Sequence, residues 1–500
     1  MGLQGDYEHT GVKAGKGATL ITAASIINTL ISFAFYAIAA RILGPQGMGK
    51  VALIFLLIGL FNVLSLLSLN SSMTYFVSYH LGRGETEMAF STLRGLLRTS
   101  LAVSLAALAV FLALSGRISE LTGLSVMTVV ITGVAGLLTN VSNLLTGALY
   151  GISEYSSTAI QSILIYVFSR IPAIALARAL GPSGVAAAWA LGSAAGSAYP
   201  AYKLRGKFGV KGKGESFREL FRYSLPLYIL SLISFAQGWL GISVLYAVTG
   251  SLSVIGAYYV VSASAGILSI AYSPITSVLF PYMSYRHGER GPETIGQTLG
   301  QVEGIIIFTV LSVSLFAAGA SRPLIELFYG RSYAADSLAF SILSAGLIFS
   351  ALATVYSTAL QSMKMTHLQL FSGGISVGAL LALLAVLSRP LGANGVAASA
   401  VISSAVGAII SYALIKARSG HRIRLHFRKI ATPIMVLLVL YVAQFFFGFD
   451  SPLKDVVFDA AVFLIALVIL SKLLRPLTPE EKSLLRATLP SYIRWIASLV

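Results

Sequence analysis

The chain contains about 14 long apolar runs, and their length restricts the folds open to it. Each has close to the ~20 mostly apolar residues that an α-helix needs to cross a bilayer. The composition agrees, because 11% of the residues are charged, against about a quarter in soluble proteins. We therefore predict an all-α integral membrane protein. The predicted spans are 18–40, 50–72, 99–115, 125–147, 158–180, 183–202, 224–248, 254–280, 299–319, 336–361, 368–388, 394–415, 431–449 and 455–473.

The basic residues divide unequally between the two sides of this arrangement. Tails and loops on the side of the termini hold 26 Lys and Arg, and the opposite loops hold 8 of the 35. Loops rich in Lys and Arg remain in the cytoplasm. We therefore expect a multi-pass protein of the cell (plasma or inner) membrane with both termini cytoplasmic.

The net charge of +17 raises the question of a nucleic-acid partner. The densest basic segment, KLRGKFGVKGKGESFRELFR at 203–222, lies between two predicted spans. A solvated cytoplasmic loop facing anionic lipids explains such a cluster. The sequence thus favours membrane lipids as partners and predicts no nucleic-acid binding.

One segment occurs twice. RALGPSGVAAA at 178–188 and RPLGANGVAAS at 389–399 share seven of eleven residues. Six predicted helices separate the copies, so the two halves have the same orientation in the membrane. This pattern predicts two six-helix bundles related by a pseudo-twofold axis along the membrane normal, with a substrate site between them and two extra C-terminal helices.

The spans and the repeat together predict a domain organisation. It comprises a cytoplasmic N-tail (1–17), an N-terminal six-helix lobe (18–202), a basic cytoplasmic linker (203–222), a C-terminal six-helix lobe (223–416), helices 13 and 14 (417–473) and a cytoplasmic C-tail (474–500). In the C-tail, Thr478 and Glu481 have the spacing of a capping box. After Pro490, SYIRWIASLV is typical of a short interfacial segment.

Several kinds of chemistry are not indicated. The chain has no cysteine, which excludes thiol catalysis and cysteine-ligated metals. It shows no P-loop, no nucleophile elbow and no histidine pair at metal spacing. We therefore predict a transporter with no catalytic residue, metal or cofactor. All six histidines are expected in tails or loops: His9, His80, His287, His367, His421 and His426.

Arg170 lies about ten residues, or roughly 15 Å, from either end of the predicted span 158–180. A charge at that depth costs about 2.5–3.5 kcal/mol on insertion scales. Ser162, Tyr166 and Arg170 form one polar stripe, whereas Leu381 occupies the equivalent position in the second half. One interpretation is a cationic contact for an anionic substrate. The other is a buried arginine that caps carbonyls freed by a kink at Pro172.

Other spans carry uncharged polar residues that we include as candidate cavity residues. A carboxamide has four hydrogen bonds to satisfy, which draws attention to the asparagines. The candidates are Asn28, Asn62, Asn140, Gln237, Tyr258 and Ser262, besides Tyr166 and Arg170.

Acidic residues fall almost entirely in tails and loops. Glu154, Glu303, Asp336 and Asp459 are expected near helix ends, and none lies mid-helix in the first bundle. Cation-coupled antiporters normally need such a carboxylate, so a cavity with an arginine and no carboxylate favours an anionic substrate.

Four further motifs are RILGPQGMGKVALI (41–54), YSLPLYI (223–229), SPITSVLFPYMSYRHGERG (273–291) and LIELFYGRSYAADS (324–337). They resemble motifs of polysaccharide and O-antigen flippases. The resemblance covers residues 15–475 and places the chain in the multidrug/oligosaccharidyl-lipid/polysaccharide exporter superfamily. It implies two six-helix lobes around a central cavity lined largely by the first, second, seventh and eighth helices.

The resemblance also implies a function. The chain would flip a polyprenyl-(pyro)phosphate-linked oligosaccharide from the cytoplasmic to the outer leaflet by alternating access, for surface polysaccharide or glycan assembly. Glycosyltransferases or a polymerase of the same pathway would be its partners. Residues 18–40 and 51–72 of the first two predicted helices lack the cations of the peptidoglycan-precursor branch, and Asn28 stands where the drug-exporting branch usually has an aspartate. A cation-coupled multidrug or metabolite antiporter is the alternative.

Overall fold

A computed structural model describes residues 2–207, 214–291, 293–419, 427–449, 451–479 and 481–482, and these residues contain helices and no β-strand. The α-helices are α1 (Gly2–Leu66), α2 (Leu69–Gly82), α3 (Thr86–Ala113), α4 (Ser115–Thr122), α5 (Val126–Gly151), α6 (Tyr155–Leu180), α7 (Pro182–Leu204), α8 (Phe217–Thr249), α9 (Leu252–Ile267), α10 (Ser273–Arg290), α11 (Glu293–Gly319), α12 (Ser321–Tyr329), α13 (Ser337–Ala345), α14 (Leu347–Ser362), α15 (Thr366–Ser419), α16 (Phe427–Phe446) and α17 (Pro452–Leu474). Short 3-10 helices are η1 (Arg205–Lys207), η2 (Leu268–Ala271) and η3 (Arg331–Asp336).

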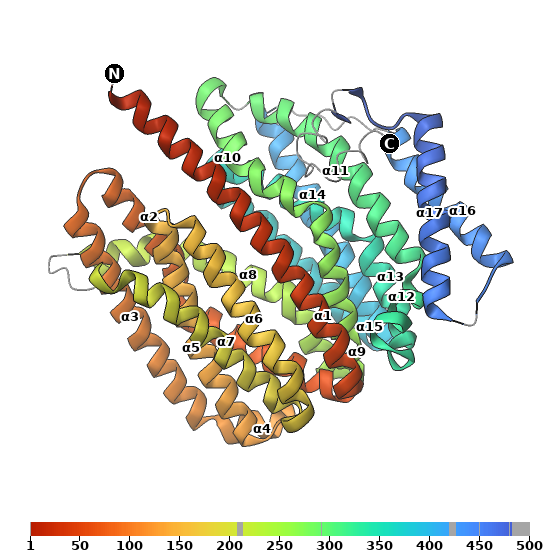
Figure 1. Cartoon of the computed structure of the whole chain (residues 1–500), viewed down its shortest axis with the longest axis horizontal. Helices are drawn as coiled ribbons and strands as arrows, with labels where there is room; N and C mark the ends of the chain where they lie inside the picture. The colour runs from red at the N-terminus through yellow and green to blue at the C-terminus, as the bar shows by residue number, and fades with distance from the viewer. Residues whose placement is uncertain are drawn as a thin grey trace. The chain divides into compact units, whose positions relative to one another are not determined.

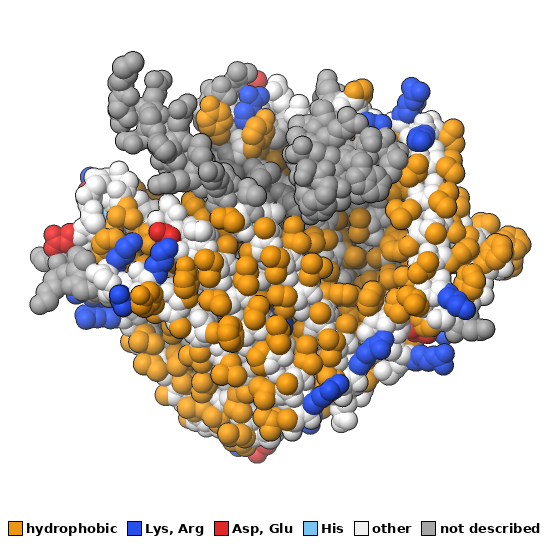
Figure 2. All heavy atoms as spheres, viewed as in Figure 1, with side chains coloured by type: hydrophobic (Ala, Val, Ile, Leu, Met, Phe, Trp, Pro, Cys, Tyr) orange, Lys and Arg blue, Asp and Glu red, His pale blue; other side chains and the backbone are white. Residues whose placement is uncertain are grey.

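The described helices have the length and polarity of membrane spans. Eleven are long and apolar enough to cross a bilayer. On the visible face of the molecule, Figure 2 shows apolar side chains over most of the surface and few charged ones. This distribution confirms an all-helical, multi-pass membrane protein.

Two of the long helices each contain a bend at a glycine. Gly44 in α1 has φ 64° and ψ 178°, and Gly392 in α15 has φ 54° and ψ −131°. Each bend separates two helical segments within one element. A positive φ is readily adopted only by glycine, so these residues permit the turns between neighbouring predicted spans.

The repeated sequence forms the same turn in both copies. Gly181 has φ 61° and ψ −144°, close to the values of its counterpart Gly392. Three residues later, a Cβ on Gly184 would overlap the carbonyl oxygen of Leu176, and a Cβ on Gly395 would overlap that of Leu387. The glycines of the repeat therefore serve turn geometry and close backbone approach.

The chain divides into two compact units. The first contains residues 1–239 and 251–256, and the second contains residues 240–250 and 257–500. In the first unit, α5, α6 and α7 pack side by side (Figure 1), and one apolar core gathers around Leu93, Leu145 and Leu149. In the second, a larger core surrounds Val355 and Tyr356.

Three predicted spans are wrong as single helices. The span 50–72 is interrupted at Leu67 and Ser68, where both residues have positive φ. The span 254–280 divides into α9, η2 and α10, whose first turn contains Pro274, a residue suited to a helix start. The span 336–361 divides into α13 and α14.

The prediction that the histidines lie in tails or loops is also wrong. His80 lies in the last turn of α2 and is buried, His287 lies in α10, and His367 lies in α15. The helices extend beyond the apolar runs, because helix ends outside a membrane need no hydrophobic sequence. For the same reason Glu303 is buried inside α11 rather than near its end.

The C-terminal capping box is confirmed. Glu481 Oε2 accepts a hydrogen bond from the Thr478 amide at 2.9 Å, and the Glu481 amide donates to Thr478 Oγ1 at 3.3 Å. The other carboxylate oxygen of Glu481 pairs with the buried ammonium of Lys429. This pair attaches the C-tail to the start of α16. The segment SYIRWIASLV lies outside the described residues.

The close approach at Gly395 leads to a stability prediction. We expect Gly395→Ala to lower the thermal unfolding midpoint of the purified protein, because the added methyl must displace the Leu387 carbonyl. Gly378→Ala is the matched control in α15, since its Cβ meets open space and removing a helical glycine is favourable by up to about 1 kcal/mol. Equal midpoints for the two variants would contradict this account.

Candidate functional site

The backbone between α1 and α2 is unusual for a membrane segment. Leu67 (φ 51°) and Ser68 (φ 56°) are consecutive non-glycine residues in the left-handed region. Such residues cost about 1–3 kcal/mol each and occur where surrounding structure enforces them. The Ser68 carbonyl accepts a hydrogen bond from the Ser71 amide at 3.1 Å, which starts the next helix. Non-helical backbone at membrane depth is tolerated only where it is buried in protein or lines a water-filled cavity.

A cavity of about 380 Å³ lies beside this helix break, inside the first unit. Its walls come from the end of α1, the start of α2 and the middle of α8. The lining residues are Gly59, Asn62, Val63, Leu66, Ser68, Asn70, Ser71, Leu227, Ser231 and Phe235. None of these described residues is ionisable. The wall therefore offers carboxamides, hydroxyls, aliphatic groups and one aromatic ring.

Asn62 has a defined orientation in this wall. Its Nδ2 donates to the Ile58 carbonyl at 2.6 Å, and its Oδ1 accepts a weak bond from Asn143 Nδ2 at 3.4 Å. Across the cavity, the Ser68 hydroxyl donates to Ser231 Oγ at 3.4 Å. The two bonds of 3.4 Å are easily exchanged for bonds to a ligand, because their length is near the upper limit for hydrogen bonding.

Gly59 allows α8 to approach α1 closely. A Cβ at this position would lie 3.1 Å from the Phe235 ring and 3.3 Å from Trp239 Nε1. Because Gly59 has no side chain, it leaves room for the Phe235 ring in the cavity wall. Aromatic rings in such walls give apolar contact area.

Of the residues predicted from the sequence, only Asn62 lines this cavity. Gln237 lies on α8, is exposed, and is not part of the lining. Tyr258 and Ser262 lie on α9 in the second unit, where Tyr258 is buried and Ser262 Oγ donates to the Tyr259 carbonyl at 3.0 Å.

Asn28 and Asn140 lie inside the helix bundle of the first unit. Asn140 Nδ2 donates to Ser65 Oγ at 2.6 Å and to Ser104 Oγ at 3.0 Å, which joins α5 to α1 and α3. Asn28 Nδ2 donates to Ser162 Oγ at 3.2 Å, which joins α1 to α6. Polar contacts of this kind hold membrane helices together.

Arg170 is buried between α6 and α7. Its guanidinium carbon lies 3.9 Å from the ring centroids of both Tyr166 and Trp189, and Nη1 donates to Ser169 Oγ at 2.6 Å. Trp189 in turn contacts Phe55, with ring centroids 4.3 Å apart. A desolvated cation–π contact is worth about 2 kcal/mol or more, so the two rings offset much of the cost of burying this charge.

Sequence reasoning missed Ser68, Ser71, Ser231 and Phe235. The run SLNSS at 68–72 carries a signal, because clusters of serine and asparagine often mark a break between helices. No comparable signal marks Ser231 or Phe235. Their position in the wall depends on how α8 packs against α1.

Comparison with known proteins gives both a family and a fold. The family model described as "Polysaccharide biosynthesis protein" matches residues 14–287. No curated protein matches the sequence.

Solved structures with a similar fold include three transporters of related kinds. The lipid II flippase MurJ in an inward closed conformation has a TM-score of 0.73 and 13% identity, covering 91% of this chain and 98% of that one. An inward-facing multidrug resistance MATE family transporter of the MOP superfamily has a TM-score of 0.60 and 18% identity. The match covers 81% of this chain and 98% of that one. A MOP superfamily transporter from Pyrococcus furiosus, described as having a binding pocket of reverse polarity, has a TM-score of 0.59 and 18% identity, covering 81% and 96%.

Identities this low establish the fold alone, whereas the family model spans more than half of the chain. The chain therefore belongs to the polysaccharide biosynthesis protein family and has the fold of MOP superfamily transporters.

Proposed function

We propose that this protein is a flippase that moves a polyprenyl-(pyro)phosphate-linked oligosaccharide from the cytoplasmic to the outer leaflet by alternating access. The observation that carries the proposal is the cavity beside the Leu67–Ser68 break, whose uncharged wall combines carboxamides and hydroxyls with apolar groups. Its volume of about 380 Å³ falls within the range of ligand sites, about 300–1,000 Å³.

The chemistry of the wall suits a sugar. Sugar hydroxyls both donate and accept hydrogen bonds, and so do the carboxamides of Asn62 and Asn70 and the hydroxyls of Ser71 and Ser231. The Phe235 ring adds an apolar surface for the C–H face of a sugar ring. The polyprenyl chain remains in the lipid, and the head group crosses through the protein.

Charge movement supplies a driving force. With both termini in the cytoplasm, as the positive-inside pattern supports, each negative charge moved outward gains about 2.3 kcal/mol per 100 mV. A pyrophosphate with two charges gains about twice that. A flippase of this kind acts between enzymes that make the sugar in the cytoplasm and enzymes that extend it outside. Its proposed partners are therefore glycosyltransferases or a polymerase of the same pathway.

The fold similarity to MATE transporters supports a second candidate, a cation-coupled multidrug or metabolite antiporter. A cationic drug would favour a carboxylate in the cavity wall. The described lining residues include none, so the flippase remains the preferred function.

Native mass spectrometry of the purified protein separates the two candidates. The flippase predicts a bound polyprenyl-phosphate sugar, and a bound small cation would favour the antiporter.

Asn62 is the residue that we expect to contact the sugar. In vesicles containing a polyprenyl-diphosphate-linked disaccharide, Asn62→Ala should lower the transport rate per molecule about tenfold, because one or two hydrogen bonds are lost. Its unfolding midpoint should change little. Asn140→Ala is the matched control, since Asn140 bonds two other helices; it should lower the midpoint more than the transport per folded molecule. A lower midpoint with unchanged transport for Asn62→Ala, or lost transport at an unchanged midpoint for Asn140→Ala, would contradict this assignment.

Arg170 needs a separate test, because the sequence allows a substrate contact and the stacking supports a packing role. We expect both Arg170→Ala and Trp189→Ala to lower the unfolding midpoint, since Trp189→Ala removes one of the two cation–π contacts of Arg170 and Arg170→Ala removes both. Transport per folded molecule should stay within about twofold. Loss of transport by Arg170→Ala at an unchanged midpoint would instead support the anionic-substrate contact.

A further inference from the structure

The helices α2 and α8 provide opposite sides of the cavity and also meet beyond it. Asn70 and Ser71 of α2 face the cavity, as do Leu227 and Ser231 of α8. One turn further along α2, Tyr75 stacks on Tyr223 of α8 with ring centroids 4.3 Å apart and planes 17° apart. Phe76 meets the same Tyr223 ring edge-on at 5.4 Å.

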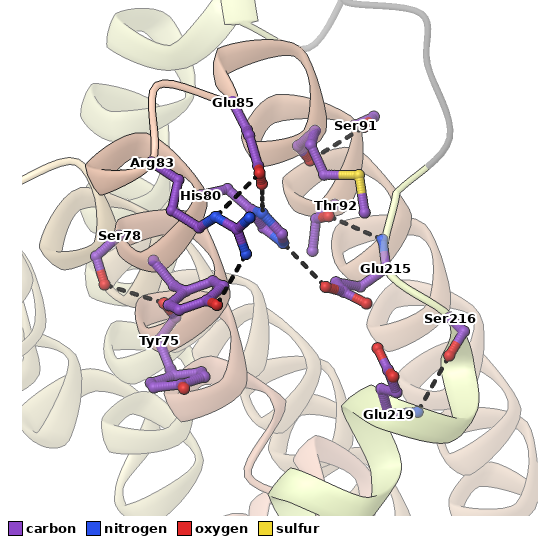
Figure 3. Close-up of polar contacts among 12 residues, drawn as sticks. Tyr75, Ser78, His80, Arg83, Glu85, Ser91, Thr92, Glu215, Ser216 and Glu219 are labelled. Carbon is purple, nitrogen blue, oxygen red and sulfur yellow. Dashed lines mark hydrogen bonds and ion pairs between the residues drawn. The ribbon is translucent and has the colours of Figure 1, made fainter.

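His80 makes the next contact across this seam (Figure 3). Its Nδ1 lies 2.7 Å from Glu85 Oε2, on its own α2–α3 hairpin. Its Nε2 lies 3.1 Å from Glu215 Oε1, in the segment that leads into α8. The Glu215 amide donates to Thr92 Oγ1 at 3.0 Å, which fixes that segment against α3.

The His80 ring lies between two carboxyl groups, with one ring nitrogen facing each of them. Arg83 Nε lies 3.1 Å from Glu85 Oε1, and Glu219 on the first turn of α8 lies beside Glu215 (Figure 3). The His80 side chain is only 4% exposed, so its contacts with both carboxyl groups are shielded from water.

We propose that Tyr75, Tyr223, His80 and Glu215 form a latch that closes the cavity on the side of the basic 203–222 loop and opens to admit the substrate head group. The proposal rests on the proposed function, because it treats the cavity as the transport route. Opening breaks the Tyr75–Tyr223 stacking, the His80–Glu215 contact and the bond from the Glu215 amide to Thr92 Oγ1. Glu85 lies on the same hairpin as His80 and remains its partner when the seam opens.

The two sides of the seam differ in how firmly they are held. On the α2 side, a Cβ on Gly147 of α5 would overlap the Asn70 carbonyl, and Thr74 Oγ1 donates to the Gly147 carbonyl at 3.0 Å. On the other side, Pro226 lies within α8 between Tyr223 and the cavity residue Leu227. Proline removes a helical hydrogen bond and favours bending. The moving part is therefore the first part of α8, which pivots at Pro226.

The natural absence of cysteine provides a direct test. Ser71→Cys places one thiol in the cavity wall of the otherwise unchanged chain. Its reaction with a membrane-impermeant thiosulfonate is measured in vesicles that expose the 203–222 loop to the reagent. We expect slow labelling in this background and labelling about tenfold faster with Glu215→Gln or Tyr223→Ala.

Arg83→Gln is the matched control, because Arg83 contacts Glu85 and Tyr79 on its own hairpin and does not cross the seam. It should leave the labelling rate unchanged. His80→Gln combined with Glu215→Gln should label no faster than the faster of the two single variants, since both weaken the same His80–Glu215 contact. Unchanged labelling with Glu215→Gln, or equal acceleration with Arg83→Gln, would overturn the latch.

The assay also separates the latch from the proposed function, because labelling needs no substrate. Faster labelling in the latch variants, together with no transport of lipid-linked sugar by the parent chain, would retain the latch and reject the flippase. Transport by the parent chain, together with unchanged labelling in the latch variants, would retain the flippase and reject the latch. An unfolding midpoint measured for each variant identifies any that fail to fold, and Tyr223→Ala tests the seam independently of the ionic pair.

Discussion

The lack of water in the bilayer interior is the constraint on which the described structure depends. Each peptide N–H and C=O in that region must find a partner within the protein, and the described segments satisfy this requirement as helices. The break at Leu67 and Ser68 comes directly after the candidate span Leu20–Leu66 and interrupts this helical pattern. A cavity lies beside it, and the hydroxyls and carboxamides in the cavity wall can bond backbone groups freed at the break.

Polar side chains in the first unit have two different uses. Asn140 and Asn28 bond neighbouring helices, and Arg170 is stacked between two rings, so these groups contribute to packing. Asn62 lies at the cavity, and one of its two bonds, from Asn143, is long and exchangeable. Beyond the cavity, aromatic stacking joins α2 to α8, and a His80–Glu215 contact joins α2 to the segment before α8. The cavity wall and the seam that we propose to open thus involve the same two helices.

Much of the fold was predictable because its causes are local in sequence. Hydropathy and length indicate the spans, and the repeated glycines indicate the turns at Gly181 and Gly392. The capping box at Thr478 follows from residue spacing. The break at Leu67 has a weaker signal, because it contains neither glycine nor proline and only the serine- and asparagine-rich run at 68–72 marks it. The partners of Arg170 depend on the rotation of α7 about its axis, and the lining by Ser231 and Phe235 depends on the packing of α8. Such contacts between distant segments leave little trace in one sequence.

The central claim is that the protein transports a lipid-linked sugar. Its most direct test uses purified protein in sealed vesicles that contain a polyprenyl-diphosphate-linked disaccharide. An impermeant sugar-modifying enzyme measures the fraction of the lipid on each face. Protein-dependent movement that accelerates when the membrane potential favours export of negative charge is the predicted result. Movement no faster than in protein-free vesicles, or uptake of a cationic dye driven by a sodium or proton gradient in its place, would contradict the account.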